Sequence, residues 1–226
     1  MRTVIFDLDG TLADTSGDLI AAANACFQRA GRGAPLDPVA DAATAFLGGR
    51  AMLQLGYERL DGAADDAEVA AHYPYLLDYY GAHIDRHTTL YPGVAEAVAR
   101  LRGAGYAVGI CTNKPEALAE VLLSRLGVRD LFASLIGADT LPVRKPDPAP
   151  YIAAVERAGG SVARSLLVGD TATDRTTARA AGVPCVLVGF GPAADIVAGL
   201  TPEGLIGHYD ELFDLAERLI PREAAE

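Results

Sequence analysis

The chain has 226 residues, half of them hydrophobic, and a formal net charge of −11 at pH 7. This length is enough to bury a full core, and the composition is typical of a soluble globular protein, not of a fibrous or disordered one. The sequence has no cluster of Lys and Arg that would form a basic face for nucleic acid. We therefore expect no nucleic-acid partner.

The sequence also argues against a membrane partner. No apolar run reaches the roughly 18 residues of a membrane span, and the first residues lack the apolar core and cleavage site of a signal peptide. Cys26, Cys111 and Cys185 lie in apolar runs at no metal-binding spacing, as expected for buried free thiols in a reducing compartment. We expect a cytoplasmic protein, and the sequence leaves open whether it is a monomer or a homodimer.

The first predicted element is a strand at residues 3–6, and the segment after it is helical. Residues 15–88 show no convincing strand and carry four helical patterns of apolar residues. These are Leu19, Ala23, Cys26, Phe27 and Ala30; Val39, Ala42, Ala43, Phe46 and Leu47; Met52, Leu53, Tyr57 and Leu60; and Val69, Tyr73, Leu76, Leu77 and Tyr80. We interpret residues 15–88 as a helical cap domain inserted after the first strand.

Beyond residue 88, short continuous apolar runs alternate with helical patterns. The predicted strands are 106–111, 133–137, 165–169, 184–189 and, more weakly, 205–207, and the predicted helices are 93–102, 115–126, 149–158, 172–181 and 210–220. Such alternation is typical of a parallel sheet covered by helices on both faces. The expected fold is α/β: a doubly wound, Rossmann-like core formed by residues 1–14 and 89–226, with the inserted cap.

Two acids stand at the end of the first strand. Asp7 and Asp9 are two residues apart, so on an extended chain they face the same way. Gly10 follows, and a glycine lets the backbone turn sharply. The spacing predicts that both carboxylates point into one cavity.

Other strand ends carry polar side chains as well: Thr112, Asn113 and Lys114; Lys145 in the loop before the fourth strand; and Asp170 with Asp174. Ligands of doubly wound sheets bind at the carboxyl ends of the strands. Packing several carboxylates there is repulsive unless a cation lies among them, and an oxygen-only ligand set favours Mg²⁺. Residue spacing alone leaves Asp174 open, either as a helix cap or as part of the site.

This set of residues fits phosphoryl transfer. A metal, Lys145, and the hydroxyl and backbone N–H of Thr112 would cradle a phosphate, and one free carboxylate would attack phosphorus. The expected partner is thus a small phosphorylated metabolite.

At these residues the sequence resembles the haloacid dehalogenase superfamily over nearly its whole length. "FDLDGTLADT", "CTNK", Lys145 of "RKPDP" and "GDTATD" are similar to its four motifs. The resemblance implies a nucleophilic Asp7 that forms an aspartyl-phosphate, Asp9 as general acid and base, and phosphate binding by Thr112, Asn113 and Lys145. It also implies Mg²⁺ held by the Asp7 carboxylate, the Asp9 backbone carbonyl and Asp170, with Asp174 supporting these ligands.

Within the superfamily, "LYPGVAEAVARLRGAGYAVGICTNKP" and "ADTLPVRKPDPAPYI" look most like phosphoglycolate phosphatases. That resemblance implies hydrolysis of 2-phosphoglycolate to glycolate and phosphate. Alternatives on the same fold are a phosphatase of another small metabolite and a phosphosugar mutase; a non-catalytic binding protein is a third reading. Arg50, in the glycine-containing stretch "LGGRAM", is a candidate for binding a substrate carboxylate, although a solvent-facing arginine explains the pattern as well.

Overall fold

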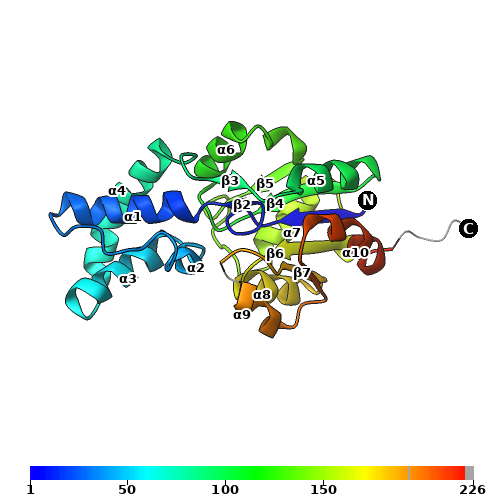
Figure 1. The fold of residues 1–226 in the computed structure, drawn as a ribbon. Helices are drawn as coiled ribbons and strands as arrows, with labels where there is room; N and C mark the ends of the chain where they lie inside the picture. The colour runs from blue at the N-terminus through cyan, green and yellow to red at the C-terminus, as the bar shows by residue number, and fades with distance from the viewer. Residues whose placement is uncertain (193, 222–226) are drawn as a thin grey trace, which may run out of the picture. The chain divides into compact units, whose positions relative to one another are not determined.

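A computed structural model describes residues 1–192 and 194–221 of the chain. Its main element is a six-stranded sheet with the order β5-β4-β1-β6-β7-β8, in which every neighbouring pair is parallel (Figure 1). These strands are β1 (Thr3–Phe6), β4 (Ala107–Cys111), β5 (Ser134–Ile136), β6 (Ser165–Gly169), β7 (Cys185–Val188) and β8 (Gly204–Ile206). Two short strands, β2 (Ala13–Asp14) and β3 (Thr89–Leu90), form a separate two-stranded sheet.

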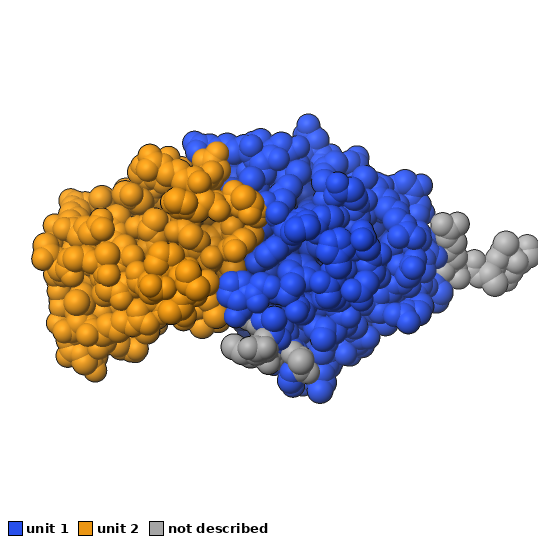
Figure 2. Space-filling model, in the orientation of Figure 1, with its two compact units in different colours: residues 1–13, 90–226 blue, residues 14–89 orange. Residues whose placement is uncertain are grey.

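The chain divides into two compact units, coloured separately in Figure 2. Unit 1 comprises residues 1–13 and 90–226, and unit 2 comprises residues 14–89. Unit 1 contains the six-stranded sheet and the helices α5 (Val94–Gly103), α6 (Glu116–Arg125), α7 (Ala149–Arg157), α8 (Ala172–Ala181), α9 (Ala194–Val197) and α10 (Leu212–Leu219). Unit 2 contains α1 (Ser16–Arg29), α2 (Ala42–Ala45), α3 (Gly49–Asp61) and α4 (Asp66–Ala82).

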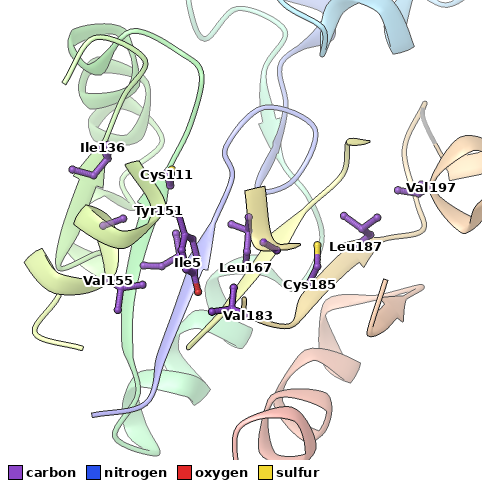
Figure 3. Close-up of a cluster of buried hydrophobic side chains, with 12 residues drawn as sticks. Ile5, Cys111, Ile136, Tyr151, Val155, Leu167, Val183, Cys185, Leu187 and Val197 are labelled. Atoms are coloured by element: carbon purple, nitrogen blue, oxygen red, sulfur yellow. The ribbon is translucent and has the colours of Figure 1, made fainter. Parts of the chain in front are cut away.

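The central strands are buried on both faces. Val4, Ile5 and Phe6 of β1 are each fully buried. On one face, α7 packs against β1, β4 and β5, while α8 packs against β6 and β7. Figure 3 shows the apolar cluster to which both helices contribute, with Ile5 near its centre. Because strands buried on both faces are largely apolar, β1, β6 and β7 read as nearly continuous hydrophobic runs, in which Thr3 and Ser165 are the buried polar exceptions.

Unit 2 is built from amphipathic helices around aromatic and aliphatic side chains. The rings of Phe27 and Tyr57 meet edge to face with their centroids 5.2 Å apart. Asp18, buried in the first turn of α1, accepts bonds from the backbone N–H groups of His87 and Thr88 at 3.0 Å each and from the Thr88 hydroxyl at 2.8 Å. These bonds tie the start of α1 to the segment that precedes β3.

The structure confirms the α/β parallel fold predicted from the sequence. Strands 3–6 and 165–169 and helix 172–181 have the predicted bounds, and the other predicted strands of the sheet differ by one residue at one end or at both. The helix predicted at 210–220 begins as a 3₁₀ turn, Tyr209–Glu211, before α10. The three cysteines are buried and free.

One predicted apolar helix face is wrong. In the segment 39–47 only the four residues of α2 are helical, and Val39 and Leu47 are 85% and 69% exposed. Polar contacts organise this segment instead: the Asp37 carboxylate accepts the backbone N–H groups of Val39 and Ala40, each at 2.8 Å. A helix of about one turn is too short to present an apolar stripe to a core.

Among the described residues, no helix combines the length and the apolar character needed to cross a membrane.

Candidate active site

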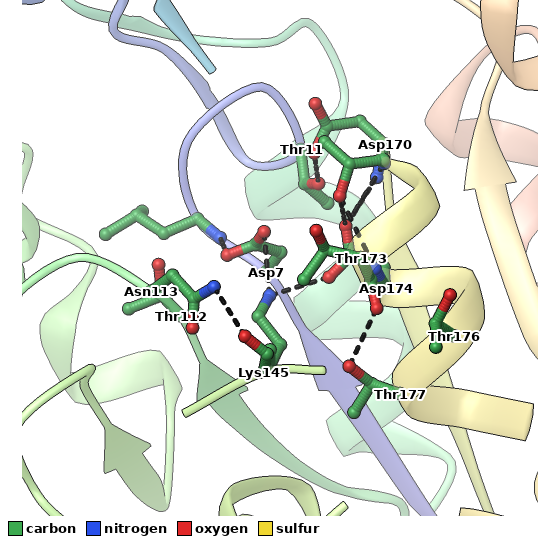
Figure 4. Close-up of polar contacts among 12 residues, drawn as sticks. Asp7, Thr11, Thr112, Asn113, Lys145, Asp170, Thr173, Asp174, Thr176 and Thr177 are labelled. Carbon is green, nitrogen blue, oxygen red and sulfur yellow. Dashed lines mark hydrogen bonds and ion pairs between the residues drawn. The ribbon is translucent and has the colours of Figure 1, made fainter. Parts of the chain in front are cut away.

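Most of the side chains predicted from the sequence to form the site follow β1, β4 and β6, and Lys145 joins them from the loop between β5 and α7 (Figure 4). These three strands are neighbours in the sheet, with β1 in the middle. Because all of them run in the same direction, the residues that follow them emerge at the same edge. Segments more than 100 positions apart in the chain are brought together in this way.

Asp7 extends β1 by one residue, since its backbone N–H donates to Val168 of β6 at 2.9 Å. One oxygen of its carboxylate, Oδ1, accepts the backbone N–H of Leu8 at 2.7 Å, and the other, Oδ2, lies 2.8 Å from Nζ of Lys145. The chain then turns at Gly10, whose φ of 78° lies in the left-handed region. Asp7 is therefore fixed at the strand end, with the turn starting immediately beyond it.

Lys145 is almost fully buried and contacts two acids. Its Nζ lies 2.6 Å from Oδ1 of Asp174 and 2.8 Å from Oδ2 of Asp7. Burial opposes the charged form of the lysine, but Asp174 and Asp7 outweigh that cost and raise the pKa of Lys145. The group remains an ammonium ion, positioned beside Asp7.

Asp174 has both roles that the sequence left open. Its Oδ2 accepts the hydroxyl of Thr171 at 2.6 Å and the backbone N–H groups of Asp170 and Thr171, completing a capping box at the start of α8. Its Oδ1 binds Lys145. Asp174 therefore caps α8 and holds the ammonium of Lys145 at the same time.

Asp170, directly after β6, has two unequal oxygens. Oδ1 accepts the hydroxyl of Thr11 at 2.7 Å. Oδ2 is buried, and no described residue forms a hydrogen bond with it. A buried carboxylate oxygen without a partner is costly, so this atom calls for a ligand.

The pKa values of Asp7 and Asp170 also favour a bound cation at this place. Burial raises the pKa of Asp7 from 3.8 to about 6; the neighbouring charge of Asp174 adds to the shift, and Lys145 opposes it. Burial, with Asp174 and Asp7 next in importance, raises the pKa of Asp170 well above its ordinary value. The protein alone thus disfavours the ionised forms of two adjacent carboxylates.

A divalent cation fits this arrangement. Oxygens of Asp7, Asp170 and Asp174 all lie within 4.8 Å of one another, and all three residues are buried. Fully ionised, three carboxylates and the one ammonium of Lys145 leave a net charge of −2 (−3 + 1), which a divalent cation balances. Carboxylate oxygens are suitable ligands for a hard ion, and Oδ2 of Asp170 is free to bind it.

Asp9 lies apart from the cluster and forms its own ion pair. Its Oδ1 is 2.7 Å from Nζ of Lys114, with side chains 17% and 4% exposed respectively. Lys114 is one of the polar residues that follow the second predicted strand, and the structure buries it before α6 begins.

The structure corrects one detail predicted for the second motif. The backbone N–H of Thr112 donates to Ile136 of β5 at 2.9 Å, so it is not available to a phosphate. The Thr112 hydroxyl accepts the N–H of Lys114 at 3.2 Å and keeps its own proton to donate. The amide of Asn113 donates to the backbone carbonyl of Lys145 at 3.0 Å, which joins the two loops.

Two contacts that were not predicted from the sequence help to shape the site. Thr11 contacts Asp170, and Lys114 contacts Asp9. Arg50 lies in the first turn of α3 in unit 2, is exposed, and has its guanidinium 4.4 Å from the ring centroid of Tyr73. Its role in substrate binding remains a prediction from the sequence.

The protein is of the doubly wound α/β class, with a buried acidic cluster and a buried lysine at the carboxyl edge of its parallel sheet, an arrangement that can hold an anion beside a divalent cation. The model of the haloacid dehalogenase-like hydrolase family matches residues 1–182, and the chain belongs to this family.

Named relatives extend the comparison. The chain is 40% identical to a phosphoglycolate phosphatase of Mesorhizobium japonicum, covering 96% of each sequence. It is 36% identical to a phosphoglycolate phosphatase of Agrobacterium fabrum, covering 98% of this chain and 95% of the relative. A crystal structure of a predicted phosphoglycolate phosphatase from Haemophilus somnus 129pt has the same fold, with a TM-score of 0.84 at 24% identity over 95% of this chain and 97% of that one.

Proposed function

We propose that this protein is a Mg²⁺-dependent phosphatase that hydrolyses 2-phosphoglycolate to glycolate and phosphate. The observation that supports this proposal most is the arrangement of three residues at the end of β1. The Asp7 carboxylate lies beside the buried ammonium ion of Lys145, and Asp170 contributes a buried carboxylate oxygen without a hydrogen bond from any described residue. Two relatives that are 36–40% identical over nearly the whole chain carry the name phosphoglycolate phosphatase.

The chemistry assigned to the first strand end proceeds in two balanced steps. In the first, an Asp7 oxygen bonds to phosphorus as the ester P–O bond breaks, and Asp9 gives its proton to the departing alkoxide oxygen. In the second, Asp9 takes a proton from water, the water oxygen bonds to phosphorus, and the bond from Asp7 to phosphorus breaks. Inorganic phosphate leaves and both acids return to their starting states.

The proposed Mg²⁺ would be held by the Asp7 carboxylate, the Asp9 backbone carbonyl and Oδ2 of Asp170. When bound, it neutralises negative charge on the phosphoryl oxygens. Lys145 supplies a second positive charge beside Asp7, and its contact with Asp174 fixes that charge in place. The Thr112 hydroxyl is a further donor for the phosphate.

For the substrate carboxylate we propose Arg50, whose planar guanidinium suits bidentate binding of a carboxylate. Arg29 provides a matched control in the same unit, because it is also exposed and lies 4.4 Å from the ring centroid of Tyr75. Arg50→Ala is expected to raise the Michaelis constant for 2-phosphoglycolate, with Arg29→Ala leaving it unchanged. An unchanged Michaelis constant in Arg50→Ala would remove Arg50 from the proposal.

The test of the function is a panel of phosphate esters ranked by kcat/KM: 2-phosphoglycolate, hexose phosphates, nucleotides and pyrophosphate. We expect 2-phosphoglycolate to rank first, and phosphate release to be lost in EDTA and restored by Mg²⁺. Asp7→Asn is expected to abolish turnover. Asp147→Asn is the control, since Asp147 is exposed, lies in the loop that carries Lys145 and caps the N–H of Ala149, which asparagine does equally well.

Other outcomes of this panel identify other functions. Isomerised sugar phosphate in place of free phosphate, dependent on a bisphosphate activator, indicates a mutase. A different preferred ester indicates a phosphatase of another metabolite. Binding without turnover of any ester overturns the enzymatic proposal.

A further inference from the structure

Asp170 is held in an asymmetric way by residues from two distant parts of the chain. Its Oδ1 accepts the Thr11 hydroxyl at 2.7 Å, and its Oδ2 is buried without a hydrogen bond from any described residue. In its ionised, cation-binding form the Asp170 carboxylate can only accept, so the Thr11 hydroxyl donates its single proton in this bond. One hydrogen bond therefore decides which oxygen of Asp170 remains available.

The backbone of Thr11 is held by a second hydrogen bond. Thr11 is fully buried in the turn that follows β1, and its backbone carbonyl accepts the hydroxyl of Tyr209 at 2.7 Å. Tyr209 begins the 3₁₀ turn after β8, is 1% exposed, and packs its ring against Phe190 with centroids 5.6 Å apart. A hydroxyl 198 positions along the chain thus fixes the backbone that carries Thr11.

We infer that Thr11 and Tyr209 are positioning residues of the cation site, which orient Asp170 so that its Oδ2 faces the metal. This inference rests on the proposed function, because it assumes that the acidic cluster binds Mg²⁺. In this inference neither residue is a ligand of the cation. They act through Asp170: Tyr209 holds the Thr11 carbonyl, and the Thr11 hydroxyl holds Oδ1.

The physical reason is the freedom of a carboxylate to rotate. Without the Thr11 hydroxyl, the two oxygens of Asp170 become equivalent as acceptors, and the side chain loses the contact that selects one orientation. Hydrogen bonds to metal-binding carboxylates typically contribute 10- to 100-fold in affinity. Tyr209 acts one step further away, so its contribution is expected to be smaller.

The experiment is calorimetric titration of the metal-free, full-length protein with MgCl₂ alone. This readout does not depend on catalysis. Thr11→Val removes the hydroxyl at nearly constant volume and is expected to weaken Mg²⁺ binding by roughly 10- to 100-fold. Thr11→Ser keeps the hydroxyl and is expected to stay within about threefold of the wild type, while Tyr209→Phe should weaken binding by about three- to tenfold.

Tyr151→Phe is the matched control for Tyr209→Phe. Tyr151 is fully buried, and its hydroxyl shares a 2.6 Å hydrogen bond with Ser165. Removing it costs a buried hydrogen bond in the same unit without changing the contacts of Asp170. Its Mg²⁺ affinity should equal that of the wild type, although its stability falls.

Three results would overturn the inference while leaving the proposed function intact: Thr11→Val with wild-type Mg²⁺ affinity, Thr11→Ser as weak as Thr11→Val, or Tyr151→Phe as weak as Tyr209→Phe. If Thr11→Val does not fold, the comparison of Tyr209→Phe with Tyr151→Phe decides the question. A wild-type protein that binds no Mg²⁺ overturns the proposed function, and this inference with it.

Discussion

At the scale of single residues, the pairing of Asp9 with Lys114 leads to a direct prediction. The ammonium of Lys114 holds one oxygen of Asp9 at 2.7 Å in a largely buried contact. Lys114→Met removes that partner, so Asp9 loses the contact that orients it for proton transfer. We expect kcat/KM for 2-phosphoglycolate to fall by roughly tenfold or more, with partial recovery in Lys114→Arg.

Steady-state kinetics with a charge control make this test specific. Arg157→Met also removes one positive charge, but from an exposed residue in the last turn of α7, and it is expected to keep wild-type kinetics. Wild-type kcat/KM in Lys114→Met would show that Lys114 does not orient Asp9.

Part of the candidate site could be predicted residue by residue from the sequence. Asp7, Asp9, Lys145 and Asp170 could be placed together because each lies at or near a strand end, where a parallel sheet gathers its ligands. The contacts of Lys114 and Thr11 could not be predicted, since their partners lie 105 and 159 positions away in the chain. Local patterns carry no information about which side chains meet across such separations.

At the scale of elements, the end of β6 is packed against the start of α8 without room for a side chain. A Cβ on Gly169 would lie 2.4 Å from both Cβ and Cγ of Asp174. Gly169→Ala must therefore displace the helix start that holds Asp174 against Lys145. We expect a loss of roughly 1–3 kcal/mol in the free energy of unfolding, measured by urea denaturation, together with lower activity.

Gly103→Ala is the control for this substitution. Gly103 ends α5, and a Cβ there would meet nothing within 4 Å. Alanine at this position should be neutral or stabilising by up to about 1 kcal/mol. Equal stability of Gly169→Ala and the wild type would contradict the close packing of β6 on α8.

The elements differ in how well they can be predicted from the sequence. The strands of the sheet were predictable because burial on both faces demands continuous apolar runs, as in residues 165–169. The segment 39–47 was not, because its alanines mimic a helical pattern while Asp37 and Asp41 fix its turns through backbone contacts. A prediction based on the spacing of apolar residues cannot detect such polar hydrogen bonds.

At the scale of the whole molecule, the buried acids make stability depend on pH in an unusual direction. The pKa of Asp7 in the folded protein, about 6, lies above its ordinary value of 3.8. Between these values the folded state binds more protons at Asp7 than the unfolded state does, so the contribution of Asp7 to stability is fully present below about pH 3.8 and is lost as pH rises through about 6. Asp170 shifts in the same direction.

We therefore expect the metal-free protein to have a higher Tm at pH 5.5 than at pH 7.5, by a few degrees for a chain of this size. Addition of Mg²⁺ should reverse the order, because the cation favours the ionised carboxylates. Differential scanning calorimetry at the two pH values, with and without MgCl₂, measures both effects. A metal-free Tm that rises from pH 5.5 to 7.5 would contradict the assignment of raised pKa values to Asp7 and Asp170.

Asp170→Asn tests whether the acidic cluster causes the dependence of Tm on pH and Mg²⁺. It removes one of three clustered negative charges, so the metal-free variant should be more stable than the wild type at pH 7.5 and should gain little from Mg²⁺. A full Mg²⁺ response in this variant would show that the cation binds elsewhere.

The division of the chain into two compact units is a property of the whole molecule. The strand–helix alternation stops after residue 14 and resumes near residue 89, and the structure groups residues 14–89 into a compact unit of their own. Composition and periodicity indicate where such a segment starts and ends. They do not specify what its exposed side chains bind, which is why the role of Arg50 depends on kinetics.

The central claim is that Asp7 attacks phosphorus. The most direct measurement is rapid quenching of the enzyme during turnover of 2-phosphoglycolate labelled in its phosphate, followed by mapping of the labelled peptide. If Asp7 is the nucleophile, a transient, acid-stable and base-labile label is expected on Asp7 and is absent in Asp7→Asn. Label on another residue, or continued turnover by Asp7→Asn, would contradict it.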